Sequence, residues 1–207
     1  MAEEQRRKFM ETAYEQAIKD VVALNGPVAA AESGAVYENG KFTLNLYNRT
    51  FTINHPDVRV QEVGSDAAVP MWISLLLLHY LIHASGIPAD GHWITYRELP
   101  GATLFEQRFR QMAIKPLLDT YGNDAEGLIK AGNALGGLTM DRNGDAAFRF
   151  LALPKIPVSV ILYLGEDDIP STVNILFDAA APSYLPTEDL SYLGMYLAIA
   201  LMKAKPR

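Results

Sequence analysis

Two histidines stand four residues apart in the stretch LLLLHYLIHASGI, residues 75–87, inside the most apolar part of the chain. If this stretch is helical, His79 and His83 lie on one face with their Cβ atoms about 6 Å apart. Two neutral imidazoles at that separation can chelate a metal ion, and a single one can be the axial ligand of a haem iron or a corrinoid cobalt. The alternative is that both are hydrogen-bonded residues of the core or its rim. His92, which follows the turn at Gly86, is the candidate third ligand.

Aromatic and basic side chains gather near this stretch, mainly in GHWITYRELPG and in the helix predicted after it. Aromatic rings can stack on a planar ligand, and arginine guanidinium groups can pair with its carboxylates because the two geometries match. The alternative is that the arginine and glutamate of GHWITYRELPG form a structural ion pair that anchors a turn. The candidate binding residues are Trp72, Trp93, Tyr96, Arg97, Arg108 and Arg110.

Acidic residues cluster in the C-terminal part of the chain. With Arg97 and Glu98 they could form the active site of a small enzyme that acts on an anionic metabolite. Each also has an ordinary structural explanation, as a turn residue or as an acid at a helix N-terminus. The chain has no P-loop, no dinucleotide fingerprint and no nucleophile elbow, so three large enzyme classes lose their usual signal. The acidic candidates are Glu166, Asp167, Asp168, Asp178, Glu188 and Asp189.

The composition restricts the class of protein. A chain of 207 residues, 49% apolar and 20% charged, can bury a full core, and we predict a single domain over residues 1–207. The net charge of −6 argues against a nucleic-acid partner. The absence of cysteine excludes disulfides and cysteine-ligated iron–sulfur clusters. The N-terminus has no apolar signal region, and the apolar run at 71–82 is shorter than the roughly 20 residues of a membrane span. We therefore expect a cytoplasmic protein with no membrane partner.

Hydrophobic periodicity predicts the elements that must position these residues. Helical spacing at the N-terminus gives way to an alternation of apolar and polar residues, which predicts an antiparallel meander turned by Asn39-Gly40. The C-terminal half predicts more helices and strands, and Thr187 is the expected cap of the last helix. The predicted helices cover residues 2–24, 27–34, 66–85, 103–121, 124–135 and 188–203, and the later strands cover 57–63, 147–154, 158–165 and 171–179.

The helix predicted over residues 66–85 is apolar on nearly all sides, and such a helix is typically buried. Asp66 is its expected N-cap, Pro70 suits its first turn, and Gly86 ends it. The order of helices and strands shows no βαβ alternation. The predicted fold class is therefore α+β, with an antiparallel or mixed sheet packed around this buried central helix.

Four stretches resemble, in order, a family of bacterial and archaeal proteins: LLLLHYLIHASG, GHWITYRELPGATLFEQRF, PVSVILYLGEDDIPSTVNILFD and YLPTEDL. From about Ala13 to about Leu201 the chain is similar to the domain-of-unknown-function family numbered 3786. The resemblance implies a context: related proteins occur in anaerobes, and some carry an added iron–sulfur domain similar to that of corrinoid proteins in one-carbon metabolism. This chain has no cysteine and lacks that module. An electron-transfer role therefore implies a separate redox or corrinoid protein partner.

These features together favour a soluble cofactor-binding or carrier protein for a tetrapyrrole, either corrinoid or haem, in which a histidine ligates the metal. Two alternatives stay open: a small enzyme that acts on an anionic metabolite through Arg97, Glu98 and the C-terminal acids, and a non-catalytic interaction subunit. The predicted metal ligands are His79 and His83, and the predicted cofactor-binding residues are His79, His83, His92, Trp93, Tyr96, Arg97 and Arg108.

Overall fold

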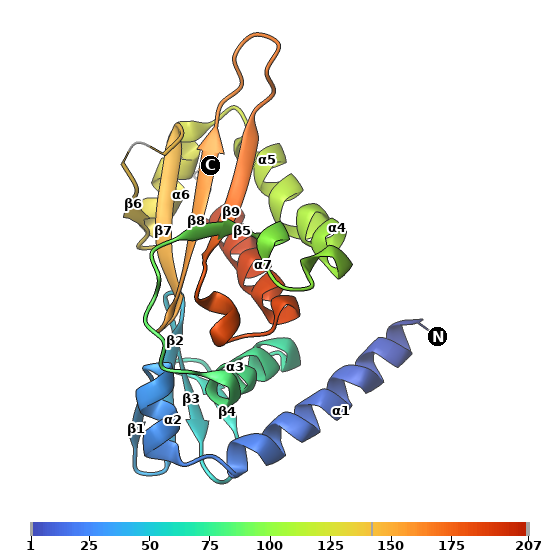
Figure 1. Ribbon diagram of the computed structural model, residues 1–207, viewed down its shortest axis with the longest axis vertical. Helices are drawn as coiled ribbons and strands as arrows, with labels where there is room; N and C mark the ends of the chain where they lie inside the picture. The colour runs from blue at the N-terminus through green and yellow to red at the C-terminus, as the bar shows by residue number, and fades with distance from the viewer. Residues whose placement is uncertain (1, 142, 206–207) are drawn as a thin grey trace. The chain divides into compact units, whose positions relative to one another are not determined.

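The computed structural model describes residues 2–141 and 143–205, which group into two compact units (Figure 1). The first unit is built from the chain up to Pro88, together with the short segments Leu153–Lys155 and Ser183–Leu185. The second unit contains the rest of the chain. Whether the two units fold together as the single domain expected from chain length stays a prediction.

The first unit contains three helices, α1 (Ala2–Val22), α2 (Gly26–Ser33) and α3 (Met71–His83). The first two agree with the helices that the sequence predicts. The side chain of Asn25 caps α2 by accepting the N–H of Val28 at 3.2 Å. The α2 helix ends at Gly34, whose φ of 73° is the left-handed conformation that glycine adopts without steric cost. Helix α1 packs against α3 near the end of α1, where Ala17 and Val21 are buried.

The sheet of the first unit is an antiparallel meander in the order β1-β2-β3-β4, as the alternation predicts. Asn39 and Gly40 both have positive φ, 51° and 69°, which suits the two-residue turn between the first two strands. One face of the sheet is buried because every second residue is apolar. The strands are β1 (Val36–Glu38), β2 (Lys41–Leu46), β3 (Arg49–Asn54) and β4 (Val60–Glu62). The buried residues of this face are Phe42, Leu44, Leu46, Phe51 and Ile53.

Helix α3 is buried as predicted, but it is shorter than predicted. It begins at Met71, directly after Pro70, and not at Asp66, so the expected cap at Asp66 is wrong. The carbonyl of Pro70 accepts the N–H groups of Ile73 and Ser74 and thereby opens the helix. The fixed φ of proline suits a helix start, whereas the residue before a proline is pushed out of the helical region, which prevents an earlier beginning.

The second unit is built on a five-stranded sheet in the order β5-β9-β8-β7-β6. Strand β5 pairs with β9, β9 with β8, and β7 with β6, each in antiparallel orientation. The three long strands are those that the sequence predicts, and together with the first sheet they confirm the α+β class. The strands are β5 (Trp93–Thr95), β6 (Leu138–Thr139), β7 (Ala146–Leu153), β8 (Ile156–Tyr163) and β9 (Thr172–Asp178).

The helix predicted over residues 103–121 is confirmed from Glu106 to Tyr121, but it is not one regular α-helix. It consists of α4 (Glu106–Phe109), a π-helical segment (Arg110–Ile114) and α5 (Lys115–Tyr121), after a short 3-10 turn. The cause is Pro116, which cannot donate a hydrogen bond to the preceding turn and whose ring would meet the carbonyl four residues back. The backbone widens just before it, and the N–H of Lys115 bonds to the carbonyl of Arg110, five residues earlier.

The last helices of the second unit are α6 (Ala125–Ala134) and α7 (Thr187–Lys203), close to the predicted bounds. Asp124 caps α6 by accepting the N–H of Gly127 at 2.8 Å. Thr187 is not the cap of α7. Pro186 holds that position, and the Thr187 hydroxyl donates to the carbonyl of Pro100 at 2.6 Å. The buried side of α7 fills the core of this unit with Leu190, Leu193, Leu197, Ala198 and Leu201.

Candidate functional site

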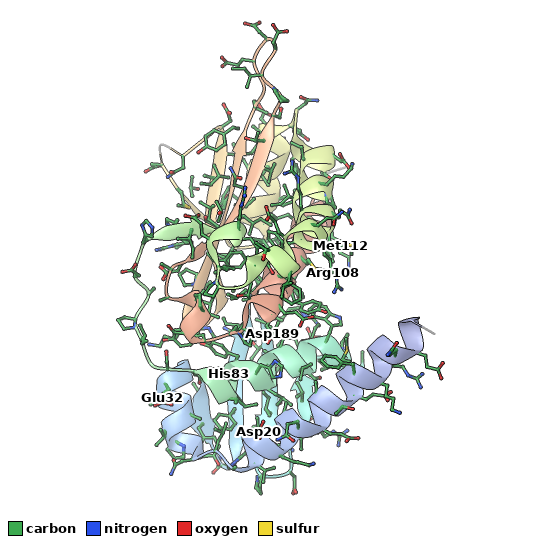
Figure 2. All side chains as sticks on the ribbon, turned by 45° about the vertical axis from the view of Figure 1, so that its right-hand side comes forward. Asp20, Glu32, His83, Arg108, Met112 and Asp189 are labelled. Carbon is green, nitrogen blue, oxygen red and sulfur yellow. The ribbon has the colours of Figure 1, made fainter. Side chains whose placement is uncertain are left out.

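The two histidines of α3 lie side by side, as their spacing predicts. Their ring centroids are 5.9 Å apart, His79 is half-buried and His83 is exposed, and Figure 2 shows His83 on α3. Within residues 2–141 and 143–205, no three His, Cys, Asp or Glu side chains form a group that could hold a metal ion. His92 is exposed and belongs to the second unit, whereas His79 and His83 belong to the first.

The other predicted binding residues all belong to the second unit, except Trp72 on α3. Trp93 is half-buried and opens β5, where it faces Asp178 of β9. Arg108 is half-buried on α4, where Figure 2 labels it. Its guanidinium carbon lies 5.6 Å from the centre of the Tyr192 ring. Arg97 is exposed. Trp93, Arg97 and Arg108 therefore share a unit, and of these three only Arg97 lines the groove described below.

Tyr96 is buried and has a structural environment. Its ring stacks on Phe109 with centroids 4.2 Å apart, and its hydroxyl donates to the carbonyl of Thr187 at 3.1 Å. Burial raises the pKa of the Tyr96 hydroxyl to about 12. The hydroxyl is therefore protonated at physiological pH and can act as a hydrogen-bond donor but not as a base.

A capping box ends β5 after three residues. The Glu98 carboxylate accepts both the N–H and the hydroxyl of Thr95, each at 2.7 Å. These hydrogen bonds hold the pKa of Glu98 below its usual value, the backbone bond from Thr95 being the largest cause. The chain turns into a 3-10 helix at Tyr96 and leaves the sheet. The motif T-Y-R-E is visible in the sequence, and it places the Glu98 carboxylate as the capping acceptor of this turn.

The early end of β5 leaves part of β9 with a free edge. On one side β9 pairs with β8, from Thr172 opposite Tyr163 to Phe177 opposite Val158. On the other side it pairs with β5 only from Leu176 onward. Residues 172–175 of β9 therefore have a strand on one side only, among the strands of the described chain.

A groove of about 420 Å³ lies along this free edge. One side of the groove is β9, and the other side is formed by α4, the π-helical segment and α5. Figure 1 shows α5 beside β9. The floor is apolar, and the half-buried Ile114 and Leu118 are accessible from the groove. The residues on its helical side are Phe109, Arg110, Ile114 and Leu118, and those on its sheet side are Thr95, Tyr96, Arg97 and residues 170–175, with Glu106 near Arg97.

Two arginines border this groove, which makes it locally positive in a protein of net charge −6. Arg97 has one partner across the rim, Glu106, at 4.0 Å, and the Arg97 side chain is 78% exposed. A surface pair at this distance contributes little, so the guanidinium group of Arg97 can turn toward a ligand. Arg110 is also exposed. The sequence predicts Tyr96 and Arg97 as binding residues and suggests Arg110. It does not predict the apolar floor, because the floor residues lie at and after the π-helical segment, and the only sequence signal of that segment is Pro116.

The acidic residues proposed for an enzyme do not gather in this groove. Asp178 is 1% exposed, and its two oxygens accept the N–H groups of Asp90, Gly91 and Ala180 at 2.8 to 2.9 Å. Glu98 caps the turn after β5, and Glu188 belongs to the first turn of α7. None of these three carboxylates is among the residues that line the groove.

The fold and the groove define an α+β protein with two antiparallel sheets, one of which offers a partly free edge beside an arginine-bordered groove. The chain belongs to the family described as a domain of unknown function, DUF3786, which matches residues 27–200. Searches of the curated proteins and of the solved structures gave no match. None of the helices in the described residues has the length and apolar character needed to span a membrane.

Proposed function

We propose that this chain is a binding protein whose groove in the second unit holds an anionic ligand with an apolar body. The observation that carries the proposal is the combination of two arginines at the rim with an apolar floor. Binding sites commonly pair a mainly apolar lining with a few polar groups that orient the ligand. The net charge of −6 further favours a role without nucleic acid, and we place the protein in the cytoplasm without a membrane partner.

The arginines supply selectivity, because a guanidinium group can form two parallel hydrogen bonds with a carboxylate or sulfonate. A hydrogen bond to a charged group contributes about 1.5 kcal/mol or more, which corresponds to roughly tenfold in affinity. The floor supplies the larger part of the affinity at about 25 cal/mol per Å² of apolar surface buried. An anionic aromatic probe should therefore bind better than a neutral probe of the same size.

The test uses the fluorescent probe 8-anilinonaphthalene-1-sulfonate and its uncharged relative N-phenyl-1-naphthylamine. We expect saturable binding of the sulfonate, and about tenfold weaker binding to the double variant Arg97→Ala/Arg110→Ala, whereas the neutral probe should bind both proteins alike. The matched control is Arg149→Ala, since Arg149 is an exposed arginine of β7 in the same unit that does not line the groove. Equal sulfonate affinity in the double variant and the wild type would overturn the proposal.

A second candidate function is the histidine-ligated tetrapyrrole carrier that the sequence predicts. The observation in its favour is the adjacent pair of imidazoles on α3, with Trp72 two turns earlier on the same helix. Haem iron or corrinoid cobalt needs only one or two axial ligands from the protein, so this pair of imidazoles is by itself a sufficient ligand set for such a group. No histidine lines the groove of the second unit, so this candidate is independent of the groove.

Titration with haemin tests this candidate. We expect a saturable shift of the Soret band in the wild type, and a loss of at least tenfold in affinity in His79→Ala/His83→Ala, because an axial imidazole bond is removed. His92→Ala is the matched histidine variant and should retain the spectrum. An unchanged spectrum on mixing, or identical titrations for all three proteins, rules the candidate out.

A further inference from the structure

We propose that the ligand of the groove is an extended, acidic segment of a partner protein, which adds as a new strand to the free edge of β9. This inference rests on the proposed function and names its ligand. Four properties of the second unit support it: the backbone groups that the edge presents, the side chains that face an incoming strand, the residue types of the free stretch, and the charge of the rim.

The backbone argument follows from the alternation of a strand. The N–H of Ala179 bonds to the carbonyl of His92 at 2.8 Å, so Ala179 directs its backbone groups toward the β5 side. Every second residue of a strand points the same way, and therefore Phe177, Ile175 and Val173 do so as well. Phe177 meets Ile94 of β5, but β5 has already ended before it reaches Val173. The N–H and C=O of Val173 therefore point into the groove, where another strand can bond to them.

The side chains of the groove suit an extended chain. A strand rises about 3.4 Å per residue, so four residues cover the free stretch 172–175. The side chains of an added strand would alternate between the apolar side, where Ile114 and Leu118 are half-buried, and the open side. Strand addition between a sheet edge and a helix is a recurrent mode of peptide recognition, in which main-chain bonds give affinity and side-chain pockets give specificity.

The free stretch itself carries none of the residue types that usually protect a sheet edge. Free edges in soluble proteins commonly carry lysine, an interior proline or a bulge that prevents another strand from binding. The stretch Thr172-Val173-Asn174-Ile175 contains none of these residue types, and Val173 and Ile175 both pair regularly with β8. Arg97 and Arg110 at the rim select acidic side chains, because their two positive charges face one carboxylate, that of Glu106.

The test uses three fluorescein-labelled peptides of seven residues and measures fluorescence anisotropy. The first peptide alternates valine and glutamate, the second replaces glutamate by lysine, and the third keeps valine and glutamate but has N-methyl groups on every second amide. N-methylation removes the donors of one peptide edge and leaves the side chains unchanged. We expect the acidic peptide to bind, and each of the other two to bind at least tenfold more weakly.

Two protein variants complete the test. Val173→Pro removes the N–H that faces the groove, a position where an edge strand tolerates proline, and should weaken the acidic peptide at least tenfold. The sulfonate probe should still bind to this variant, which shows that the groove is intact. Arg97→Ala/Arg110→Ala should weaken the acidic peptide and remove its preference over the lysine peptide.

The outcomes separate the two proposals. If the acidic and N-methylated peptides bind equally well and both depend on the arginines, strand addition is wrong while the anionic-ligand function stands. If the sulfonate probe does not depend on the arginines, the proposed function itself fails. If no peptide binds but the chain forms dimers that Val173→Pro dissociates, the occupant of the edge is a second copy of this chain, and the partner proposal is overturned.

Discussion

Replacing Asp178 by alanine is expected to lower the free energy of unfolding of the second unit by about 4 kcal/mol, because three charged hydrogen bonds are lost at once. The carboxylate is 1% exposed and accepts the N–H groups of Asp90, Gly91 and Ala180. These bonds tie the loop before β5 to the end of β9. Without them the alanine variant leaves the N–H of the buried Ala180 without its acceptor, and the position of β5 beside the groove is weakened.

Urea unfolding of single-tryptophan proteins measures this effect. The chain has two tryptophans, Trp72 in the first unit and Trp93 in the second, so a Trp72→Phe background reports on the second unit alone. Asp178→Asn keeps one acceptor oxygen and should lose about 2 kcal/mol, between the wild type and alanine. Asp168→Ala, an exposed acid of the β8–β9 hairpin, should be neutral. A loss below 1 kcal/mol in Asp178→Ala would show that this carboxylate is not a structural anchor and would reopen a catalytic role for it.

Replacing Tyr80 by phenylalanine is expected to destabilise the first unit by about 3 kcal/mol. The Tyr80 side chain is fully buried, and its hydroxyl donates to the carbonyl of Ser33 at 2.5 Å and accepts the N–H of Lys155 at 3.0 Å. The phenylalanine ring fills the same space and keeps the stacking against Tyr184, but it leaves one donor and one acceptor without a partner. Each such buried group costs about 1 to 3 kcal/mol.

The same hydroxyl predicts a pH dependence. Burial raises the pKa of Tyr80 above its ordinary value of 10.0, so the folded state keeps a proton that the unfolded state releases. The contribution of this hydroxyl to the free energy of unfolding is fully present below pH 10. It is lost as the pH rises toward the pKa of Tyr80 in the folded state. A Trp93→Phe background reports on the first unit, and Tyr14→Phe, at a half-buried tyrosine of α1 in the same unit, is the matched control. If Tyr80→Phe unfolds at the same urea concentration as the control, the hydroxyl is not a structural link between α2, α3 and the β7–β8 turn.

These single-tryptophan proteins also test the single-domain prediction. If the Trp72 and Trp93 signals change at the same urea concentration in otherwise unsubstituted protein, the two units unfold cooperatively as one domain. Separate transitions show that each unit is a domain of its own. The result also decides whether a variant in one unit can be expected to leave the other unit folded.

Much of the secondary structure was predictable because it depends on local chemistry. The alternation around Asn39-Gly40 forms the first meander, and Asp124 caps α6. Both were predictable because a hairpin turn and a helix cap involve only neighbouring residues. The wrong caps at Asp66 and Thr187 have one cause. In each case a nearby proline, Pro70 or Pro186, fixes the backbone at the helix start, and the side chain expected to cap does not do so.

The sequence by itself determined the fold class, the buried helix α3 and the side-by-side placement of His79 and His83, because period and spacing dictate which side chains share a face. Only the tertiary structure decided where a ligand can bind. The groove exists because the turn at Thr95–Glu98 ends one strand early and because Pro116 reshapes a helix far along the chain from β9. Each of these local events is readable from the sequence. That the turn after β5 and the π-helical segment lie at the same sheet edge depends on the pairing of strands distant in sequence. Residue spacing does not predict such pairing.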